Sequence, residues 1–495
     1  MGVGRTGSGS SALSDEALPA LATTVGVPGY DRSRVTAGVV HVGVGGFHRG
    51  HQALYLDRLM EATGDLSWGI CGVGVLPGDR AMKDALEAQD CLYTVIEKHG
   101  DGTQEVRVVG SLVDYLFSPD DPEAVVERMA AESTRIVSLT ITEGGYVAEA
   151  EDPDVAHDLE SGAAPRTAFG LIAEALRRRR ERDFVPFTVV SCDNLQRNGD
   201  LARERLTAFA RLRDPELGDW IERETRFPSS MVDRITVATT DEDRAELAER
   251  HGVEDRWPVV CEPYLQWVLE DAFSAGRPPL EEVGVQVVED VEPYELMKLR
   301  LLNASHQALA YLAYLAGHRF VHEAAQDPPF RELLRGYMDE EAMPTLPEVP
   351  GVDLEDYRRT LLERFSNPGV RDTVARLCAY SSDRIPQWLL PVVRRQLETG
   401  GEIRRSASVV AAWARYAEGI DESGEPIEVI DTRSERLTER AKRQRTEPDA
   451  FLEDRELFGD LVENERFVAA YRAALTSLHQ QGARATVEAL DQTTT

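Results

Sequence analysis

Three side chains that can exchange a proton or stabilise charge stand in one apolar stretch of the chain. Residues 294–317 read YELMKLRLLNASHQALAYLAYLAG, in which Lys298, Asn303 and His306 interrupt a run rich in leucine and alanine. A helix that is apolar on every side is normally buried, and buried polar groups are costly unless they are paired or used. Burial disfavours the charged form of lysine, and a neutral lysine is a good general base. The stretch therefore predicts a buried amine that performs acid–base chemistry, with an ion-paired or solvent-reaching lysine as the alternative.

The spacing of these side chains predicts that they share one face of a continuous α-helix. Pro293 suits the start, where its missing N–H costs nothing, and Gly317 suits the position just after the last turn. At about 100° per residue, His306 lies about 80° and Asn303 about 140° from Lys298 around the helix axis. We therefore expect an uninterrupted helix that projects an amine, a carboxamide and an imidazole into one arc.

The choice of lysine at position 298 is itself informative. The other lysines of the chain are Lys83, Lys98 and Lys442, and elsewhere the positive charge comes from arginine. Arginine cannot give up its proton, whereas lysine can do so when it is desolvated. A lysine kept inside an apolar helix of such a chain indicates chemistry that needs deprotonation.

The composition excludes several classes of partner and site. A formal net charge of −32 argues against binding to nucleic acid or to anionic membranes. The five cysteines are scattered and form no CxxC pair, which fits a reducing cytosol and indicates no zinc site. His48 and His51 have no acidic or sulfur partner nearby in the sequence, so no metal is predicted there either.

No membrane or export signal is predicted. No apolar run reaches the length needed to cross a bilayer. Residues 1–14 are rich in glycine and serine and lack the apolar core of a signal peptide, so we expect a frayed start. At 495 residues, the chain is expected to be a cytoplasmic protein of two or more domains.

Residues 34–50, RVTAGVVHVGVGGFHRG, have the form of a dinucleotide-binding turn. The valines predict a short buried strand, and residues 51–60 predict a helix. Between a strand and a helix, glycines let the backbone approach a pyrophosphate at the helix N-terminus. The third glycine of G-x-G-x-x-G is replaced by His48, and an ordinary turn is the alternative. The residues expected to contact the cofactor are Gly43, Val44, Gly45, Gly46 and Phe47.

The second predicted strand, residues 68–75, leaves the cofactor choice open. It lacks the acidic residue that usually grips the adenosine ribose at the end of this strand. Asp79 is the nearest carboxylate, and it either reaches a ribose hydroxyl or caps the next helix. Arg80 beside it keeps NADP possible as well as NAD.

Two further predicted strands end in residues that can face a ligand. Strand 135–142 is followed by Glu143 in the turn EGGY, and strand 187–191 is followed by Asn194 in SCDN. Loops at the carboxyl ends of parallel strands line the ligand crevice of such sheets. Asn194 can donate an N–H to a ligand oxygen, or it can form an ordinary Asx turn, which the residue chemistry alone favours.

The order of the predicted elements gives an α/β Rossmann-like N-terminal domain followed by a mostly α-helical C-terminal domain. Two β-like runs, 92–97 and 106–112, predict a hairpin inserted among the βα units. Further helices are expected at 329–338, 353–365, 370–379, 391–398, 407–418 and 468–480, and the charged residues 435–460 are expected to form a solvated face. The predicted division is an N-terminal extension at 1–34, an NAD(P)-binding domain at 35–290 and a helical substrate domain at 291–495.

Four stretches together resemble a known family. GVGGFHRGHQALYLDRL, TITEGGY, SCDNLQRNG and MKLRLLNASHQALAYL are similar to motifs of the polyol-specific long-chain dehydrogenases and reductases, and the similarity runs from about residue 35 to about residue 489. The resemblance implies a zinc-independent, NAD(P)-dependent alcohol dehydrogenase that acts on a small polyol or ketose. It also favours a monomer.

The family motif K-x-x-x-x-N-x-x-H matches Lys298, Asn303 and His306 residue for residue. The resemblance implies that the lysine is the general acid/base and that the histidine orients the substrate hydroxyls. It further implies that Asn194 joins Asn303 in an oxyanion hole.

The resemblance also implies a substrate site. Asp233 and Arg376 match residues of that site in the family, and Arg384 stands where the family usually has lysine. Arg376 and the TEGGY sequence favour members that interconvert D-mannitol and D-fructose. Members that reduce fructuronate are the alternative, and Arg384 leaves arabinitol or sorbitol open. A non-catalytic dinucleotide-binding sensor would belong to another class, but it would not need Lys298 together with two asparagines.

Overall fold

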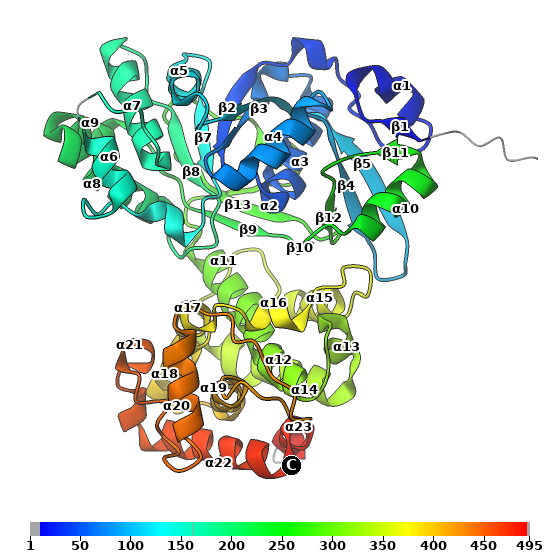
Figure 1. The fold of residues 1–495 in the computed structure, drawn as a ribbon, viewed down its shortest axis with the longest axis vertical. Coiled ribbons are helices and arrows are strands. Elements are labelled where there is room, and N and C mark those ends of the chain that lie inside the picture. Colours follow the sequence, from blue (N-terminus) through cyan, green and yellow to red (C-terminus); the bar gives the residue numbers. More distant parts are fainter. Residues whose placement is uncertain (1–9, 161, 493–495) are drawn as a thin grey trace, which may run out of the picture. The chain divides into compact units, whose positions relative to one another are not determined.

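The computed structural model describes residues 10–160 and 162–492 and consists of two compact units (Figure 1). The first unit comprises Met1–His99 and Thr103–Glu292, and the second comprises Gly100–Gly102 and Pro293–Thr495. The first unit combines strands with helices, whereas the elements of the second unit are helices. The predicted fold class, an α/β Rossmann-like part followed by a mostly helical part, is confirmed.

A five-stranded parallel sheet forms the centre of the first unit. Its strands are β2 (Ala37–Val42), β3 (Gly69–Gly74), β6 (Leu112–Phe117), β7 (Ile136–Leu139) and β8 (Thr188–Ser191), in the order β6-β3-β2-β7-β8. Every residue of β2 is buried, as expected for a strand covered on both faces. The strand order reverses between β2 and β7, and this switch point is where open α/β sheets bind their ligands.

Helices cover both faces of this sheet. Val40 and Val42 point into one apolar cluster, and Val39 points into the other. The first cluster is built with α5 (Pro122–Ala130), α6 (Pro153–Leu159), α7 (Ala168–Glu181), α8 (Asn198–Arg213) and α9 (Pro215–Glu224). The second is built with α3 (Gln52–Thr63) and α4 (Arg80–Glu87). Because neighbouring valines of β2 point to opposite faces of the sheet, this one strand packs against the helices of both layers.

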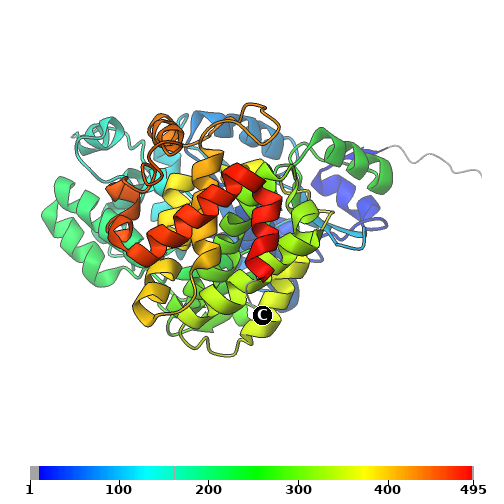
Figure 2. The ribbon, with the colours of Figure 1, turned by 90° about the horizontal axis from the view of Figure 1, so that it is seen from below.

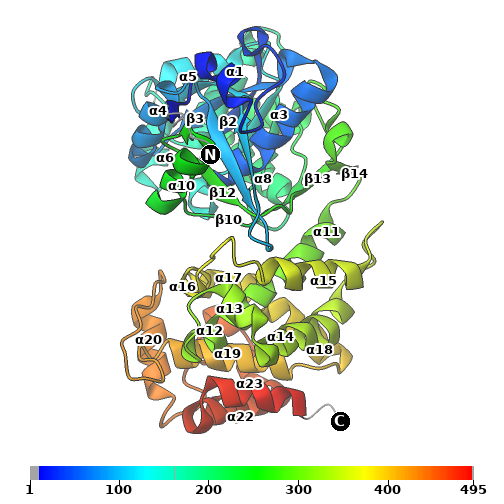
Figure 3. The same ribbon diagram turned by 90° about the vertical axis from the view of Figure 1, so that its right-hand side faces the viewer.

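Among the described residues, three smaller sheets complete the first unit (Figure 3). The predicted hairpin is confirmed, because β4 (Tyr93–Lys98) and β5 (Gln104–Val109) pair antiparallel. They join β12 (Val259–Cys261) and β10 (Thr236–Val237) in a four-stranded sheet, and α10 (Asp241–His251) follows β10. A three-stranded sheet contains β9 (Ser230–Asp233), β13 (Gln266–Glu270) and β14 (Gln286–Val288).

The start of the chain differs from the prediction of a frayed segment at residues 1–14. Residues 1–9 lie outside the described residues, but β1 (Ser11–Ala12) pairs with β11 (Val253–Glu254). Leu13 is buried, and Leu21 at the end of α1 (Leu18–Leu21) is buried in the same apolar cluster. The prediction is wrong for residues 11–14 because Leu13 has an apolar partner surface supplied by distant strands.

The second unit is built around α12 (Ala304–Leu315), which is buried at every position except Tyr314. Around it are α11 (Glu292–Met297), α13 (Val321–Gln326), α14 (Pro328–Gly336), α15 (Leu354–Phe365), α16 (Val374–Cys378), α17 (Ser381–Trp388), α18 (Leu390–Thr399), α19 (Arg404–Tyr416), α20 (Ser434–Arg443), α21 (Arg455–Phe458), α22 (Glu465–Gln481) and α23 (Ala483–Gln492). The last two, red in Figure 2, pack side by side. Within the described residues, no helix is long and apolar enough to cross a membrane.

A buried carboxylate joins three helical segments of the second unit. Glu418, just after α19, accepts hydrogen bonds from Gln444 (2.9 Å), Arg445 (2.9 Å) and His479 of α22 (2.6 Å). Burial alone would raise the pKa of Glu418, but these hydrogen bonds outweigh it and lower the pKa to about 2. The residues 435–460, predicted as a solvated face, contribute Gln444 to this network and bury Leu437.

Replacing Glu418 tests this network. Because the folded-state pKa lies below the ordinary value of 4.5, the stabilisation is complete above pH 4.5 and is lost as the pH falls towards 2. It amounts to on the order of 3 kcal/mol at neutral pH. We expect Glu418→Gln to lower the thermal unfolding midpoint at pH 7 by several degrees, with the difference shrinking between pH 5 and pH 3. The control Glu456→Gln removes an exposed carboxylate paired with two arginines and should change little. Equal effects of the two substitutions would contradict the assignment.

Candidate active site

The segment that carries Lys298 is not the continuous α-helix that its spacing predicts. Lys298–Asn303 forms a π-helix between α11 and α12, and the Ala304 N–H bonds to the carbonyl of Leu299, five residues back. The prediction is wrong here because a π-turn widens the helix. Residues five apart, such as Lys298 and Asn303, are then separated around the axis by a much smaller angle than the about 140° of an α-helix. The wider turn brings the amine and the carboxamide closer to one face than α-helical geometry allows.

All three predicted chemical groups of this segment are buried. The exposed fraction is 7% for Lys298, 5% for Asn303 and 7% for His306. The Asn303 Oδ1 and the Ser305 hydroxyl have no hydrogen-bond partner among the described residues, so they keep bonding capacity inside the unit. The His306 ring packs against Phe365 of α15 with their centroids 4.4 Å apart.

A second π-helix, Tyr337–Ala342, holds the first in place. The Tyr337 hydroxyl donates to the carbonyl of Arg300 (3.2 Å), and the Arg300 guanidinium donates to the carbonyl of Thr345 (2.5 Å). Bonds to Arg300 therefore fix the middle of the Lys298 π-turn. Nothing in the local sequence signals either π-helix, because both depend on partners more than 30 residues away.

The two predicted substrate-site arginines lie together beside α12. Arg384 donates to the carbonyls of Arg376 (3.1 Å) and Leu377 (3.3 Å), and Gln307 of α12 donates to the same Leu377 carbonyl (3.2 Å). Arg376 also makes a bidentate pair with Asp372 (2.7 and 2.5 Å). Any substrate contact of Arg376 is therefore made by a guanidinium whose orientation is already fixed.

The glycine turn of the first unit has a backbone that only glycine allows. Gly43 adopts φ +90°, and a Cβ at this position would lie 2.2 Å from the carbonyl oxygen of Thr140. The helix expected at residues 51–60 is present as α3, which begins at Gln52, and the short helix α2 (Gly46–Gly50) precedes it. Val44 is buried, and Phe47 stacks on His51 with centroids 4.9 Å apart.

A chain of buried hydrogen bonds fixes this turn, and sequence reasoning missed it. The Thr140 hydroxyl donates to the Gly43 carbonyl (2.6 Å) and therefore accepts from Nε2 of His41 (2.9 Å). The Nδ1 of His41 then accepts from the Ser138 hydroxyl (2.8 Å). Burial lowers the pKa of His41 to about 3, so its ring is neutral. His48 stacks on His41 with centroids 3.4 Å apart, which explains the histidine at the position of the usual third glycine.

Asp79 and Arg80 have local partners. The Asp79 carboxylate accepts the backbone N–H groups of Val75 and Leu76 (2.9 Å each), so it closes the turn after β3. Arg80 makes a bidentate pair with Asp120. Asp79 stands at the N-cap position of α4, but its side chain makes no capping hydrogen bond to that helix. Its contact with a ribose remains a prediction.

Asp193, which precedes the predicted oxyanion residue Asn194, is the centre of a second network. Its carboxylate accepts from the N–H of Ile141 (3.2 Å), the N–H of Thr142 (2.8 Å) and the hydroxyl of Tyr146 (2.8 Å). Asn194 itself is exposed. The network therefore joins the loop after β8 to the loop after β7, which contains Glu143; the Glu143 side chain lies outside the described part of the chain.

Asn198 extends this network to the strand that carries Asp233. Its carboxamide donates to the carbonyls of Asp193 (2.9 Å) and Ser230 (2.8 Å) and accepts from the Ser230 N–H (2.9 Å). Ser230 begins β9, and the buried Asp233 ends it. Hydrogen bonds of neighbouring residues thus connect the two loops and the strand that carry the predicted site positions 143, 194 and 233. The position of Asp193 at the carboxyl end of a strand was the only sequence signal for it.

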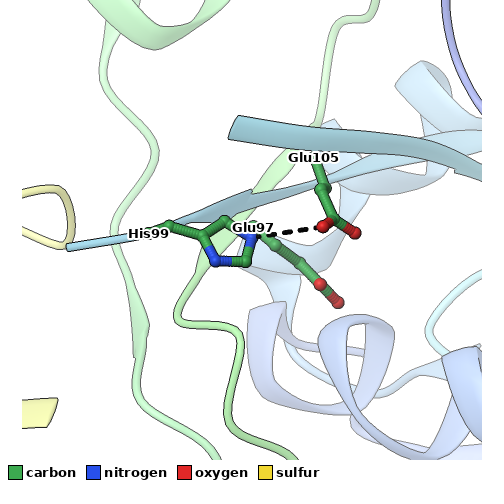
Figure 4. A group of neighbouring side chains, drawn as sticks. All are labelled: Glu97, His99 and Glu105. Carbon is green, nitrogen blue, oxygen red and sulfur yellow. Dashed lines mark ion pairs between the residues drawn. The ribbon is translucent and has the colours of Figure 1, made fainter. Parts of the chain in front are cut away.

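Among the described residues, one group of three side chains has the spacing of a metal site (Figure 4). Glu97 and Glu105 face each other across the β4–β5 ladder, and His99 lies beside them with Nε2 3.5 Å from Glu105. Glu97 already meets Arg234 at 2.6 Å and Arg58 at 3.5 Å. These positive charges oppose a cation at the same carboxylate.

Comparison with known proteins gives matches along nearly the whole chain. The family model described as "Mannitol dehydrogenase Rossmann domain" matches residues 37–282, and "Mannitol dehydrogenase C-terminal domain" matches residues 290–479. A mannitol 2-dehydrogenase of Phaeosphaeria nodorum is 50% identical over 474 residues, which are 94% of this chain and 83% of that protein. One of Aspergillus fumigatus is 48% identical over 472 residues, which are 92% of this chain and 94% of that protein.

Solved structures agree with these matches. Mannitol 2-dehydrogenase of Pseudomonas fluorescens, in a ternary complex with NAD and D-mannitol, is 44% identical with a TM-score of 0.90 and covers 98% of this chain and 100% of its own. A D-sorbitol dehydrogenase in substrate-free form is 36% identical with a TM-score of 0.85 and covers 96% and 100%, respectively.

The glycine turn offers a stability test with a matched control. Gly43 and Gly64 both have positive φ, but an added Cβ meets the Thr140 carbonyl at position 43 and nothing within 4 Å at position 64. Gly64→Ala should cost about 1–2 kcal/mol, the usual penalty for a left-handed residue. Gly43→Ala should cost clearly more, because the backbone must also move, and thermal or urea unfolding measures both. Equal losses of unfolding free energy in the two variants would mean that the backbone of the turn moves easily and is not fixed by Thr140.

Proposed function

This chain belongs to the mannitol dehydrogenase family, and on that premise we propose that it oxidises D-mannitol to D-fructose with NAD and catalyses the reverse reduction. The observation that carries the proposal is its similarity, along almost its whole length, to proteins named for this reaction. One of them, at 44% identity, holds NAD and D-mannitol in its structure. The comparisons do not favour the alternative, fructuronate reduction.

The residues at the switch point of the first sheet fit a dinucleotide. The absence of a side chain at Gly43 leaves the backbone of the turn open to close approach, and the His41–Thr140 chain fixes the turn before a ligand arrives. We assign the holding of NAD to the turn Gly43, Val44, Gly45, Gly46 and Phe47, with Asp79 and Glu143 on the flanking loops. When bound, NAD supplies the acceptor for the hydride.

The proton chemistry is assigned to Lys298. The 7% exposure of its side chain disfavours the ammonium form, and the neutral amine can take the hydroxyl proton of the polyol. In the reverse direction the protonated amine returns that proton to the carbonyl oxygen of the ketose. The lysine thus alternates between base and acid while remaining in a dry environment.

The remaining site residues stabilise charge and hold the substrate. Asn303 and Asn194 donate carboxamide N–H groups to the oxygen as it becomes an alkoxide, which is where preorganised donors contribute most. His306, held against Phe365, orients the substrate hydroxyls. Asp233, Arg376 and Arg384 are assigned to the other polyol hydroxyls; the bidentate pair with Asp372 supports a fixed position for Arg376.

We also propose that the protein works as a cytoplasmic monomer without a nucleic-acid partner. Its net charge of −32 repels nucleic acid, and the five cysteines are all buried and free. Light scattering behind a sizing column checks the oligomeric state, and a dimer would contradict this part of the proposal.

A spectrophotometric assay tests the function directly. NADH formation is followed with D-mannitol, D-arabinitol, D-sorbitol and D-mannonate, and NADH consumption with D-fructose and D-fructuronate, each with NAD(H) and NADP(H). The proposal predicts the highest kcat/KM for mannitol and fructose with NAD(H). A higher kcat/KM for fructuronate or mannonate would overturn it, and binding of NADH without any turnover would support a sensor instead.

Replacing the buried lysine tests the proton step. Lys298→Ala should lower kcat by about 10²–10⁴-fold, the usual contribution of a general acid or base, and added primary amines should restore part of the rate. Lys442→Ala, which removes an exposed lysine from α20, is the control and should keep the wild-type kcat. An active Lys298→Ala enzyme would eliminate the assigned role.

A further inference from the structure

The loop after β7 contains a residue in a conformation that its side chain disfavours. Thr142 has φ +57° and ψ 176°, a region that is populated almost only by glycine. Threonine is branched at Cβ, so this is a genuine outlier. Such backbone strain persists only where the surroundings over-determine it, and it clusters at functional sites.

The hydrogen bonds of Asp193 hold Thr142 in this conformation. Its carboxylate binds the N–H groups of both Ile141 and Thr142, and it accepts the Tyr146 hydroxyl from the far end of the same loop. The Ser191 hydroxyl bonds to the Tyr146 hydroxyl (2.6 Å). The Gly145 N–H donates to the Thr142 carbonyl (3.0 Å) and so closes the turn. A single buried carboxylate therefore holds both ends of the loop.

The strained residue stands at the switch point. Thr140, two residues before it, holds the Gly43 carbonyl of the glycine turn. On the other side, Asp193 leads directly into Asn194, and Asn198 fixes the carbonyl of Asp193 to β9. Thr142 is therefore placed between the predicted cofactor turn and the predicted oxyanion residue, both of which are fixed by neighbouring bonds.

We propose that Asp193 is a positioning residue that holds Thr142 in its strained conformation, so that the backbone of the loop Ile141–Tyr146 forms a wall of the cofactor crevice. This inference rests on the proposed NAD-dependent function. Without the acceptor at Asp193, Thr142 relaxes to negative φ and the Thr142–Glu143 peptide turns away from the crevice. The carboxylate contributes through this backbone and touches neither cofactor nor substrate.

The test is a comparison of NADH affinities, measured by fluorescence titration so that no substrate is needed. Asp193→Asn replaces one acceptor by a donor and should weaken NADH binding at least 10-fold. Thr142→Gly in the Asp193→Asn background should recover most of that loss, because glycine adopts φ +57° without the hydrogen bonds to Asp193. Thr142→Ala in the same background should recover little, because alanine keeps a Cβ. A merely structural role of Asp193 would not distinguish glycine from alanine at position 142.

Asp255→Asn is the matched control. Asp255 is also a buried carboxylate that accepts backbone N–H groups, but its donors are Thr94 of β4 and Trp257 just before β12, which belong to the four-stranded sheet and not to the central one. It should lower the unfolding midpoint and leave the NADH dissociation constant within about twofold of wild type. An equal loss of NADH affinity in Asp255→Asn would overturn the proposal, as would equal rescue by glycine and alanine.

Two outcomes separate this inference from the proposed function. If wild type binds no NADH, the NAD-dependent function fails; if wild type binds NADH and Asp193→Asn binds it equally well, only the inference fails. Should Asp193→Asn not fold, single substitutions at Thr142 decide. Thr142→Gly alone should raise the thermal unfolding midpoint and keep NADH binding, whereas a lowered midpoint, the usual effect of glycine at an unstrained position, would overturn the proposal.

Discussion

The second unit depends on one constraint, which is that its central apolar helical segment must bury polar side chains. Helix α12 is encased by its neighbours, and a fully buried helix is most stable when it is apolar all round. The segment nevertheless buries Lys298, Asn303 and His306 at one end, and the Asn303 Oδ1 has no bonding partner among the described residues. Such groups lower stability unless they are paired or used. The proposed proton transfer gives them a use.

The π-turn shows how this constraint is met. An i→i+5 turn lets residues five apart share a face, and the turn is fixed through Arg300 by Tyr337 and Thr345. The irregular turn is thus held by hydrogen bonds at Arg300 that join it to distant residues. The first unit follows the same rule, because Thr140 and Asp193 hold the backbone of the loops at the sheet edge.

Much of the fold follows from the sequence, because it depends on local periodicity. The valines of β2, the hairpin β4–β5 and the helical second unit were all predicted from apolar spacing. Gly43 was predicted from the turn motif, and its positive φ and its clash-free approach to Thr140 explain why glycine stands there. The positions of candidate site residues at strand ends likewise follow from the rule that parallel strands share one ligand-binding edge.

The features that the sequence did not reveal depend on distant partners. The π-helix at Lys298 and the pairing of residues 11–12 with β11 each require contacts across the fold. The strain at Thr142 has no local signature, because threonine is an ordinary strand residue. The Asp372–Arg376 pair is the exception: its i,i+4 spacing was visible in the sequence and would have predicted a fixed guanidinium.

The central claim is that the buried amine of Lys298 exchanges a proton within the pH range of catalysis. The chain has only four lysines, so carbon-13 labelling of the lysine ε-carbon gives at most four NMR signals. The signal that disappears in Lys298→Arg should change its chemical shift over the pH range in which the rate of mannitol oxidation rises. If that signal keeps the chemical shift of a charged ammonium group throughout this range, Lys298 is not the base.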